Sequence, residues 1–250
     1  MDVAAAAVVP HAPLLVPGVA GARDDDALAR VRAATIEAFP RAADAVVVLS
    51  PHGRAAGVYR RVRGSLDGFG LAGCAVDVPT DDALARALAE SWGRPLLDEP
   101  CDHGVVVPLA LARPSIPVVA ATLPECTGPG AGPVRDALGD GVRVAAALRA
   151  VTAEARVAFV ASAHTAASLT TRAPLTERPE GRALDDVVIA ALAGDAARIG
   201  ALDERAWSDA GACGGGPLRA FASLASGMRA EVRAYDAPLG VGYVVAAALP

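Results

Sequence analysis

The chain alternates between short, valine-rich apolar runs and longer segments whose apolar residues recur at helical spacing. Continuous apolar runs of this length predict buried strands, at residues 3–9, 45–49, 116–122, 157–161, 232–235 and 241–247. Helical spacing with flanking capping residues predicts helices, at residues 24–39, 80–92, 103–111, 184–192, 195–202 and 214–225, with two more within 134–155. Strands that are apolar throughout are typical of a mostly parallel sheet that helices cover on both faces.

The remaining segments add little to this architecture. Residues 58–70 are mixed in polarity and bounded by glycine, which indicates a hairpin, and residues 168–182 are polar and contain proline, as exposed loops do. No internal repeat and no linker divides the chain. We therefore expect an α/β fold with a mostly parallel central sheet and helices on both faces, built as a single domain over residues 1–250.

Composition narrows the functions that are open to this protein. The chain has 250 residues, of which 53% are hydrophobic, so a sizeable core can form. Its net charge of −5 argues against the basic surface that nucleic-acid binding needs. All 23 basic residues are arginine, and the chain contains no lysine, asparagine or glutamine. This excludes Schiff-base lysines and side-chain amides as catalytic groups.

Two further features of the sequence bear on the cellular compartment in which the protein works. No apolar run approaches the length of a membrane span, about 18 residues, and the N-terminus lacks the positive charge that precedes a signal-peptide core. The four cysteines form no CxxC pair and no dense framework, which indicates reduced thiols. We expect a cytoplasmic protein with no membrane and no nucleic-acid partner.

The four histidines are the strongest candidates for chemistry. His11, His52 and His164 each follow a predicted strand within a few residues. The carboxyl ends of parallel strands meet at one edge of the sheet, where ligands bind, so we expect these side chains at that edge. His103 lies in a turn at the start of a predicted helix. Because imidazole binds Fe, Zn, Cu and Ni, this convergence predicts a metal site assembled by the fold.

Other residues near these positions rank lower. Ser162 precedes His164 by two residues, but no GxSxG motif surrounds it, so a nucleophilic serine is not expected. We interpret Tyr243 as a core residue and Cys126 as a small buried hydrophobe.

The histidines belong to short motifs that follow one another along nearly the whole chain. These motifs are Val9-Pro10-His11-Ala12-Pro13-Leu14, Val46-Val47-Val48-Leu49-Ser50-Pro51-His52-Gly53, Asp102-His103-Gly104, Val107-Pro108-Leu109 and Val160-Ala161-Ser162-Ala163-His164. In this order they resemble the class III extradiol ring-cleavage dioxygenase superfamily, of the catalytic-subunit type. The tail looks more like the related Memo-like proteins, in Gly211-Ala212-Cys213-Gly214-Gly215-Gly216-Pro217 and Gly240-Val241-Gly242-Tyr243. The resemblance implies that residues 1–250 form one domain similar to the catalytic chain of an extradiol dioxygenase.

The resemblance also implies roles for the histidines. His11 and His52 match the two histidines that bind a non-haem Fe(II) in the dioxygenases. His164 matches the histidine that acts as acid and base beside the bound catechol, and His103 matches a histidine that lines the pocket. Such roles suit an imidazole, since its pKa near neutrality lets it take and return a proton.

The third metal ligand stays open. The dioxygenases complete a facial triad with a carboxylate from the C-terminal third, for which Asp209, Glu204 and Glu231 are candidates. Memo-like proteins have a cysteine in the corresponding region, and Cys213 matches it. A site of two histidines and Cys213 would be softer, which makes copper or zinc an alternative to Fe(II). The other interpretation of Cys213 is a small residue in a tight turn.

The function implied by the resemblance is an Fe(II)-dependent extradiol-type dioxygenase that cleaves a catecholic or related aromatic compound with O2, as in aromatic compound catabolism. Its partners would be the small aromatic substrate and O2, and members of the family commonly form homo-oligomers. A Cys213 ligand without a catechol pocket would instead favour a Memo-like metal-binding or redox protein, or a catalytically silent binding protein. Activity without oxygen would favour a metal-dependent hydrolase, in which His164 activates a metal-bound water.

Overall fold

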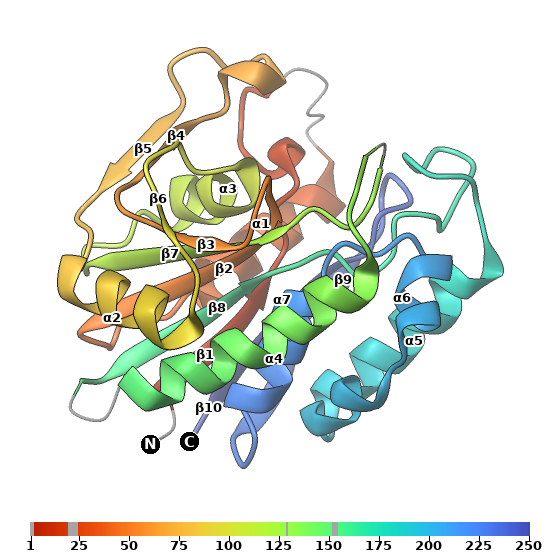
Figure 1. The fold of residues 1–250 in the computed structure, drawn as a ribbon. Helices are drawn as coiled ribbons and strands as arrows, with labels where there is room; N and C mark the ends of the chain where they lie inside the picture. Colours follow the sequence, from red (N-terminus) through yellow and green to blue (C-terminus); the bar gives the residue numbers. More distant parts are fainter. Residues whose placement is uncertain (1–2, 20–24, 129, 152–154) are drawn as a thin grey trace.

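The structure is a computed structural model that describes residues 3–19, 25–128, 130–151 and 155–250. Within these residues the main sheet has the strand order β6-β3-β7-β2-β8-β1-β10-β9 (Figure 1). Its strands are β1 (Ala5–Val9), β2 (Ala45–Gly53), β3 (Gly57–Tyr59), β6 (Leu96–Leu97), β7 (Val118–Pro124), β8 (Val157–Ser162), β9 (Arg229–Asp236) and β10 (Tyr243–Leu249). Both chain ends lie at the same end of this sheet, at the lower left of Figure 1.

The centre of the sheet is parallel. Strands β7, β2, β8 and β1 run side by side in one direction, while β10 and β9 on one flank and β3 on the other join antiparallel. In register, Val48 of β2 and Ala7 of β1 lie on either side of Val160 in β8. The predicted mostly parallel α/β sheet is therefore confirmed, and the carboxyl ends of its four central strands share one edge.

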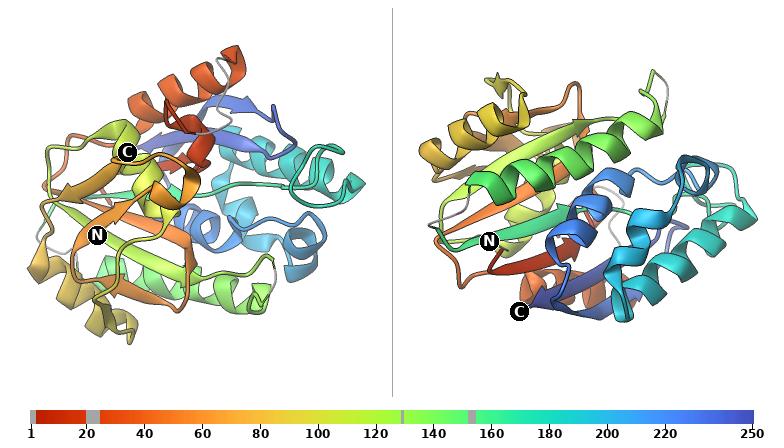
Figure 2. Two further views of the ribbon diagram at one scale, coloured as in Figure 1. Left: turned by 90° about the horizontal axis from the view of Figure 1, so that it is seen from above. Right: turned by 60° about the horizontal axis from the view of Figure 1, so that its bottom comes forward.

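Helices cover both faces of the sheet. They are α1 (Asp26–Ala38), α2 (Asp82–Trp92), α3 (His103–Ala112), α4 (Val134–Val151), α5 (Pro179–Ala193), α6 (Glu204–Asp209) and α7 (Gly215–Leu224), with 3₁₀ segments η1 (Pro13–Leu15), η2 (Asp67–Phe69) and η3 (Ala196–Ala201). Figure 2, left, shows α1 and α4 on opposite sides of the sheet. Successive residues of β2 serve different cores, since Val47 packs with the α4 side and Val48 with the α1 and α3 side.

Aspartate side chains cap α1, α2, α3, α6 and the 3₁₀ segment η3. The side chains of Asp25, Asp81, Asp102, Asp195 and Asp203 each accept a hydrogen bond from a backbone N–H of the first turn. Such caps satisfy donors that the helix itself leaves free, and a chain without asparagine relies on aspartate for them. The starts of α1, α2, α3 and α7 were predicted to within two residues, whereas α5 begins five residues before its predicted start and α6 was not predicted.

Three predictions about local structure are wrong. Residues 168–182 are not an exposed loop throughout, because Ser168 and Leu169 are buried and α5 already begins at Pro179. Residues 58–70 do not form a hairpin with one another, because β3 joins the main sheet while β4 (Val62–Ser65) pairs with β5 (Ala75–Val78). The two helices expected within 134–155 are one continuous helix, α4. Its Gly141 serves close packing rather than a break, since a Cβ there would overlap the backbone carbonyl of Gly216 in α7.

Some predicted boundaries fall outside the described residues. These are the first two residues, the start of the first helix at Asp24, position 129 in the loop at 128–132 and positions 152–154 after α4. No described helix is long and apolar enough to cross a bilayer.

Candidate metal centre

Three of the histidines arrive at the carboxyl edge of the parallel strands. His11 lies two residues after β1, His164 lies two residues after β8, and His52 is in the last part of β2. A backbone hydrogen bond of 2.9 Å from Ala163 N–H to the Val9 carbonyl holds the first two segments side by side. The prediction that these side chains share one edge is therefore correct.

The fourth histidine comes from α3. His103 is the first residue of that helix, and Asp102 caps it by accepting a hydrogen bond of 2.8 Å from Gly104 N–H. Glycine is required next, because a Cβ at position 104 would overlap the Ser50 hydroxyl. The Asp-His-Gly turn thereby aims His103 at the strand edge, where its ring centroid lies 4.3 Å from that of His52.

The four imidazoles form one cluster. The Nε2 atoms of His11 and His52 are 2.9 Å apart, and the two rings lie almost at right angles, with an interplanar angle of 85°. The His11 and His164 ring centroids are 3.8 Å apart, and His11 backbone N–H donates to His164 Nε2 over 3.2 Å. His11 is completely buried and the others are half-buried. All the histidines of the chain therefore lie within one site.

Cys213 is brought to the same place by α7. The N–H of Gly214 donates to the His164 carbonyl over 3.1 Å, and a Cβ at Gly214 would overlap that oxygen. This close approach leaves the Cys213 Sγ atom 3.6 Å from His11 Nε2. The thiol is thus buried beside the histidines, and its glycine-rich surroundings are what allow the approach.

Two sets of three potential metal ligands share His11. One set is His11, His52 and His103, and the other is His11, His164 and Cys213, each with ligand atoms within 4.8 Å of one another. The predicted set of His11, His52 and Cys213 takes members from both. His103 and His164, which were predicted to line the pocket and to transfer protons, each belong to one of these two sets.

The carboxylates considered as third ligands belong to neither set. Glu204 is exposed in the first turn of α6, and Asp209 at the end of that helix lies 3.6 Å from Arg205. Glu231 is exposed on the edge strand β9 and pairs with Arg233. The sequence could not separate these carboxylates from Cys213, because their positions depend on how α6, α7 and β9 pack.

Burial makes the cluster neutral. The pKa of His11 is lowered well below its ordinary value by desolvation and by the neighbouring His164, and the pKa of His164 falls for the same kinds of reason. Burial likewise lowers the pKa of His52, and that of His103 to about 4. Burial raises the pKa of the Cys213 thiol to about 12. Neutral imidazoles offer lone pairs to a metal, whereas the thiol would have to lose its proton on binding one.

Sequence reasoning missed a carboxylate that organises the site. Asp102 accepts hydrogen bonds from Ser50 Oγ at 2.5 Å, Tyr59 OH at 2.9 Å and Thr122 Oγ1 at 3.1 Å, besides that from Gly104. These partners tie the start of α3 to β2, β3 and β7. The sequence did contain a signal for Asp102, because an aspartate directly before a predicted helix start at His103 is typical of a helix cap.

Glu125 was missed as well. It directly follows β7, and its Oε1 atom lies 3.4 Å from His52 Nδ1. That nitrogen is buried and has no hydrogen-bond partner among the described residues. The sequence signal for Glu125, as for the histidines, was its position at the carboxyl end of a central parallel strand, where ligand-binding residues gather.

Two aromatic side chains flank the cluster. The Phe69 ring lies 5.1 Å from that of His103 and is 42% exposed, whereas the Tyr243 ring lies 5.2 Å from that of His164 and is buried. The interpretation of Tyr243 as a core residue is therefore correct but incomplete. The Phe69 ring therefore lies at the surface next to His103, and the Tyr243 ring lies in the interior next to His164.

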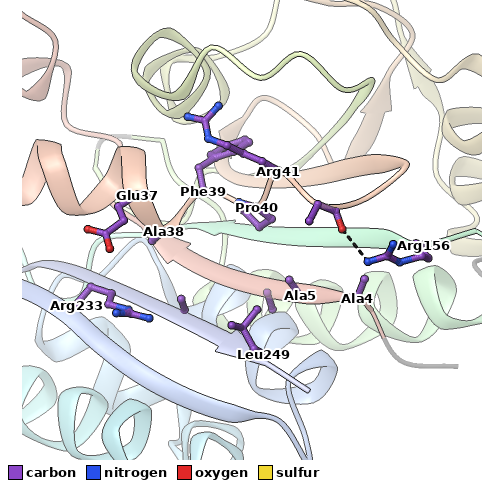
Figure 3. A pocket seen from close by; sticks show the side chains of 13 residues that line it. Ala4, Ala5, Glu37, Ala38, Phe39, Pro40, Arg41, Arg156, Arg233 and Leu249 are labelled. Atoms are coloured by element: carbon purple, nitrogen blue, oxygen red, sulfur yellow. Dashed lines mark hydrogen bonds between the residues drawn. The ribbon is translucent and has the colours of Figure 1, made fainter.

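The pocket in Figure 3 is a separate feature. It is lined by Ala4 and Ala5 at the start of β1, by Arg156 just before β8 and by Leu249 at the end of the antiparallel β10. These residues mark the amino ends of the parallel strands, opposite the histidines. Its Arg156 is already engaged by the Ala42 carbonyl at 3.1 Å.

Comparisons with known proteins find a similar fold but no matching sequence family. No family model matches the chain, and no curated protein sequence matches it significantly. Among solved structures, the chain is similar to the uncharacterized protein JW3007 from Escherichia coli K12, at 19% sequence identity and a TM-score of 0.63, over 98% of this chain and 99% of that one. At this identity the likeness shows a shared fold alone.

Proposed function

We propose that this chain is a metal-dependent oxidoreductase of the extradiol dioxygenase type, which cleaves a catecholic or related aromatic compound with O2. The observation that carries the proposal is the convergence of all four histidines at the carboxyl edge of the parallel strands, with the Nε2 atoms of His11 and His52 2.9 Å apart. The resemblance of the ordered histidine motifs to the extradiol dioxygenases supplies the reaction class.

The donors in the cluster suit a divalent transition metal. Neutral imidazole nitrogens bind Fe, Zn, Cu and Ni, and two nitrogens bound to one such ion lie about 3 Å apart, given metal–nitrogen bonds of about 2.1 Å. His11 and His52 would hold the metal, with His103 or Cys213 adjoining His11 as further ligands. Fe(II) bound here would supply Lewis acidity and electron transfer between the aromatic substrate and dioxygen.

The residues beside these ligands are placed to handle protons. A backbone N–H can only donate, so the bond from His11 N–H makes His164 Nε2 an acceptor and leaves the proton of the neutral ring on Nδ1. His103 is also neutral, because burial lowers its pKa to about 4, so its ring has a free lone pair but is a weaker base than an exposed imidazole. His164, with its proton on Nδ1, and His103, with a free lone pair, would act as proton donor and proton acceptor beside a bound substrate.

The aromatic neighbours favour an aromatic substrate. Phe69 is an exposed large hydrophobic residue beside His103, and such a side chain offers an apolar surface against which an aromatic ring can stack. Tyr243, on the other side at His164, carries a hydroxyl whose pKa burial raises to about 12, so it stays a neutral hydrogen-bond donor.

Cys213 supports a second candidate function. Its Sγ atom lies 3.6 Å from His11 Nε2, and neither set of potential ligands among the described residues contains a carboxylate. A thiolate ligand would favour a softer metal such as copper or zinc. The alternative is therefore a Memo-like metal-binding or redox protein that does not cleave catechols.

The test is the metal content of anaerobically purified protein, compared among the wild type, His52→Ala and Cys213→Ser, followed by oxygen uptake with a catechol panel. Cys74→Ser is the matched control, since Cys74 belongs to neither ligand set. Stoichiometric iron that His52→Ala loses, with catechol-dependent oxygen uptake, supports the dioxygenase. Copper or zinc that Cys213→Ser loses, without oxygen uptake, supports the alternative. Absence of bound metal after Fe(II), copper and zinc reconstitution overturns both.

A further inference from the structure

We infer that Ser162 is a positioning residue that fixes the tautomer of His11, and that Pro108 makes this possible by freeing a backbone carbonyl. The Val107-Pro108-Leu109 motif and Ser162 have no part in the function proposed above. The inference concerns the metal-free protein and is tested there. Only its consequence, a prearranged metal ligand, rests on the proposed function.

The chain of contacts begins inside α3. A helical carbonyl normally accepts from the N–H four residues later, and for Gly104 that residue is Pro108, which has no N–H. The Gly104 carbonyl is buried, because Gly104 is a buried residue of α3. A buried carbonyl needs another donor. It finds one in the Ser162 hydroxyl, 2.5 Å away.

This contact decides where the Ser162 proton goes. A carbonyl oxygen can only accept, so two oxygens 2.5 Å apart require the serine hydrogen between them. The hydroxyl has one hydrogen, which is then committed to Gly104. The oxygen of Ser162 is left as an acceptor for its second neighbour, His11 Nδ1, at 3.0 Å. His11 Nδ1 must therefore carry the hydrogen.

The hydrogen on His11 Nδ1 also determines the protonation state of the other ring nitrogen, Nε2. In a neutral imidazole with its hydrogen on Nδ1, Nε2 has a free lone pair. That lone pair faces His52 Nε2 at 2.9 Å and Cys213 Sγ at 3.6 Å, the atoms that would bind a metal together with it. Ser162 thus presents His11 as a ligand before any metal binds. It also links this ligand to the first turn of α3, which carries His103.

The tautomer is measurable directly. In protein labelled with ¹⁵N-histidine and freed of metal by a chelator, long-range ¹H–¹⁵N correlation spectra distinguish a protonated Nδ1 from a protonated Nε2. Only four histidines contribute, and His11→Gln identifies the signals of His11. We expect wild-type His11 to be protonated at Nδ1 at pH 7.5. Protonation of wild-type His11 at Nε2 overturns the inference.

Substitutions can distinguish a positioning role of Ser162 from a general loss of structure. We expect Ser162→Ala to yield a mixture of His11 tautomers and Ser162→Thr, which keeps the hydroxyl, to retain the wild-type pattern. Pro108→Ala returns an N–H that competes for the Gly104 carbonyl, so a partial mixture is expected. Ser168→Ala is the matched control, because Ser168 is equally buried and donates to the Ala210 carbonyl at 2.9 Å instead. Unchanged His11 signals in folded Ser162→Ala and Pro108→Ala overturn the inference.

A second measurement tests the consequence for metal binding. Loss of an outer hydrogen-bond partner of a metal-binding histidine typically weakens affinity 10- to 100-fold, so we expect about that loss of Co²⁺ affinity in Ser162→Ala and wild-type affinity in Ser168→Ala. If Co²⁺, Fe²⁺ and Zn²⁺ all fail to bind the wild type while the tautomers behave as expected, the proposed function fails and the role of Ser162 stands. If metal binds and the tautomers do not respond, the reverse holds.

Discussion

The Nε2 atoms of His11 and His52 lie 2.9 Å apart although 41 positions separate the two residues in the sequence. Each stands at the carboxyl end of a parallel strand, β1 and β2, and β8 lies between these strands in the sheet. Two imidazoles this close, in a buried place, share one proton or one cation between their lone pairs. The geometry of the sheet alone creates this relationship, since neither residue has a local reason to meet the other.

Cys213 gives the first prediction. A thiolate bound to Co²⁺ produces a charge-transfer absorption that imidazole ligands do not, so we expect this band in the Co²⁺-loaded wild type and its loss in Cys213→Ser. The physical basis is the 3.6 Å distance from its Sγ atom to His11 Nε2. Cys74→Ser should retain the band. A Cys213→Ser protein with an unaltered spectrum would show that the thiol stays outside the metal's ligands.

The second prediction concerns pH. In the folded, metal-free protein the pKa of each histidine is lowered from 6.5, that of His103 to about 4. Below pH 6.5 the unfolded chain therefore binds more protons than the folded one, and the free energy of unfolding falls as pH falls. Each histidine contributes a slope of up to about 1.4 kcal/mol per pH unit. The stabilisation is complete above pH 6.5, and the part due to His103 is lost by about pH 4.

Urea unfolding of chelator-treated protein between pH 8 and 5 measures this slope. His103→Gln removes one titrating group and should flatten the dependence, while it leaves the remaining three histidines in place. A free energy of unfolding that stays constant from pH 7 to pH 5 would contradict the burial of neutral histidines.

The third prediction tests the anchor of α3. The Asp102 carboxylate accepts hydrogen bonds from Ser50, Tyr59, Gly104 and Thr122. In Asp102→Asn an amide NH2 replaces one acceptor oxygen, so two of these donors lose their partner. We expect a loss of about 2–4 kcal/mol in the free energy of unfolding, together with weaker metal binding because His103 is displaced.

Asp98→Asn is the control for this substitution. Its carboxylate pairs with Arg60 at 2.8 Å, but the side chain is 76% exposed, so the change should stay within about 0.5 kcal/mol. Chemical unfolding of Asp102→Asn, Asp98→Asn and the wild type measures the change in the free energy of unfolding at both positions. Equal effects at both positions would argue against a special role for Asp102.

The fourth prediction compares two glycines in α4. A Cβ at Gly141 would overlap the Gly216 carbonyl, so Gly141→Ala should push α4 and α7 apart and destabilise the protein by about 1–3 kcal/mol. A Cβ at Gly139 would meet only the flexible guanidinium of Arg143, so Gly139→Ala should stabilise by up to about 1 kcal/mol through helix propensity. Thermal unfolding distinguishes opposite signs. A stabilised Gly141→Ala protein would mean that α4 and α7 do not pack this closely.

Local patterns account for what could be predicted of the fold. The continuous apolar run at 45–49 became β2, and the Asp81 cap began α2 where the sequence placed it. The same local logic failed within 134–155, where two helices were predicted and one continuous helix formed. Gly141 in this helix lets α7 pack closely across α4, and no pattern within 134–155 reports on a segment about 70 residues away.

By itself, the sequence determined the strands of the parallel core and most of the longer helices, that the sheet is mostly parallel, and that His11, His52 and His164 stand at strand ends. These features depend on periodicity, capping and the shared direction of parallel strands, which are short-range or general constraints. Only the tertiary structure decided that Cys213 rather than Asp209, Glu204 or Glu231 lies beside His11. That choice depends on backbone contacts such as Gly214 against the His164 carbonyl, which exist only after the strand order and helix packing are complete.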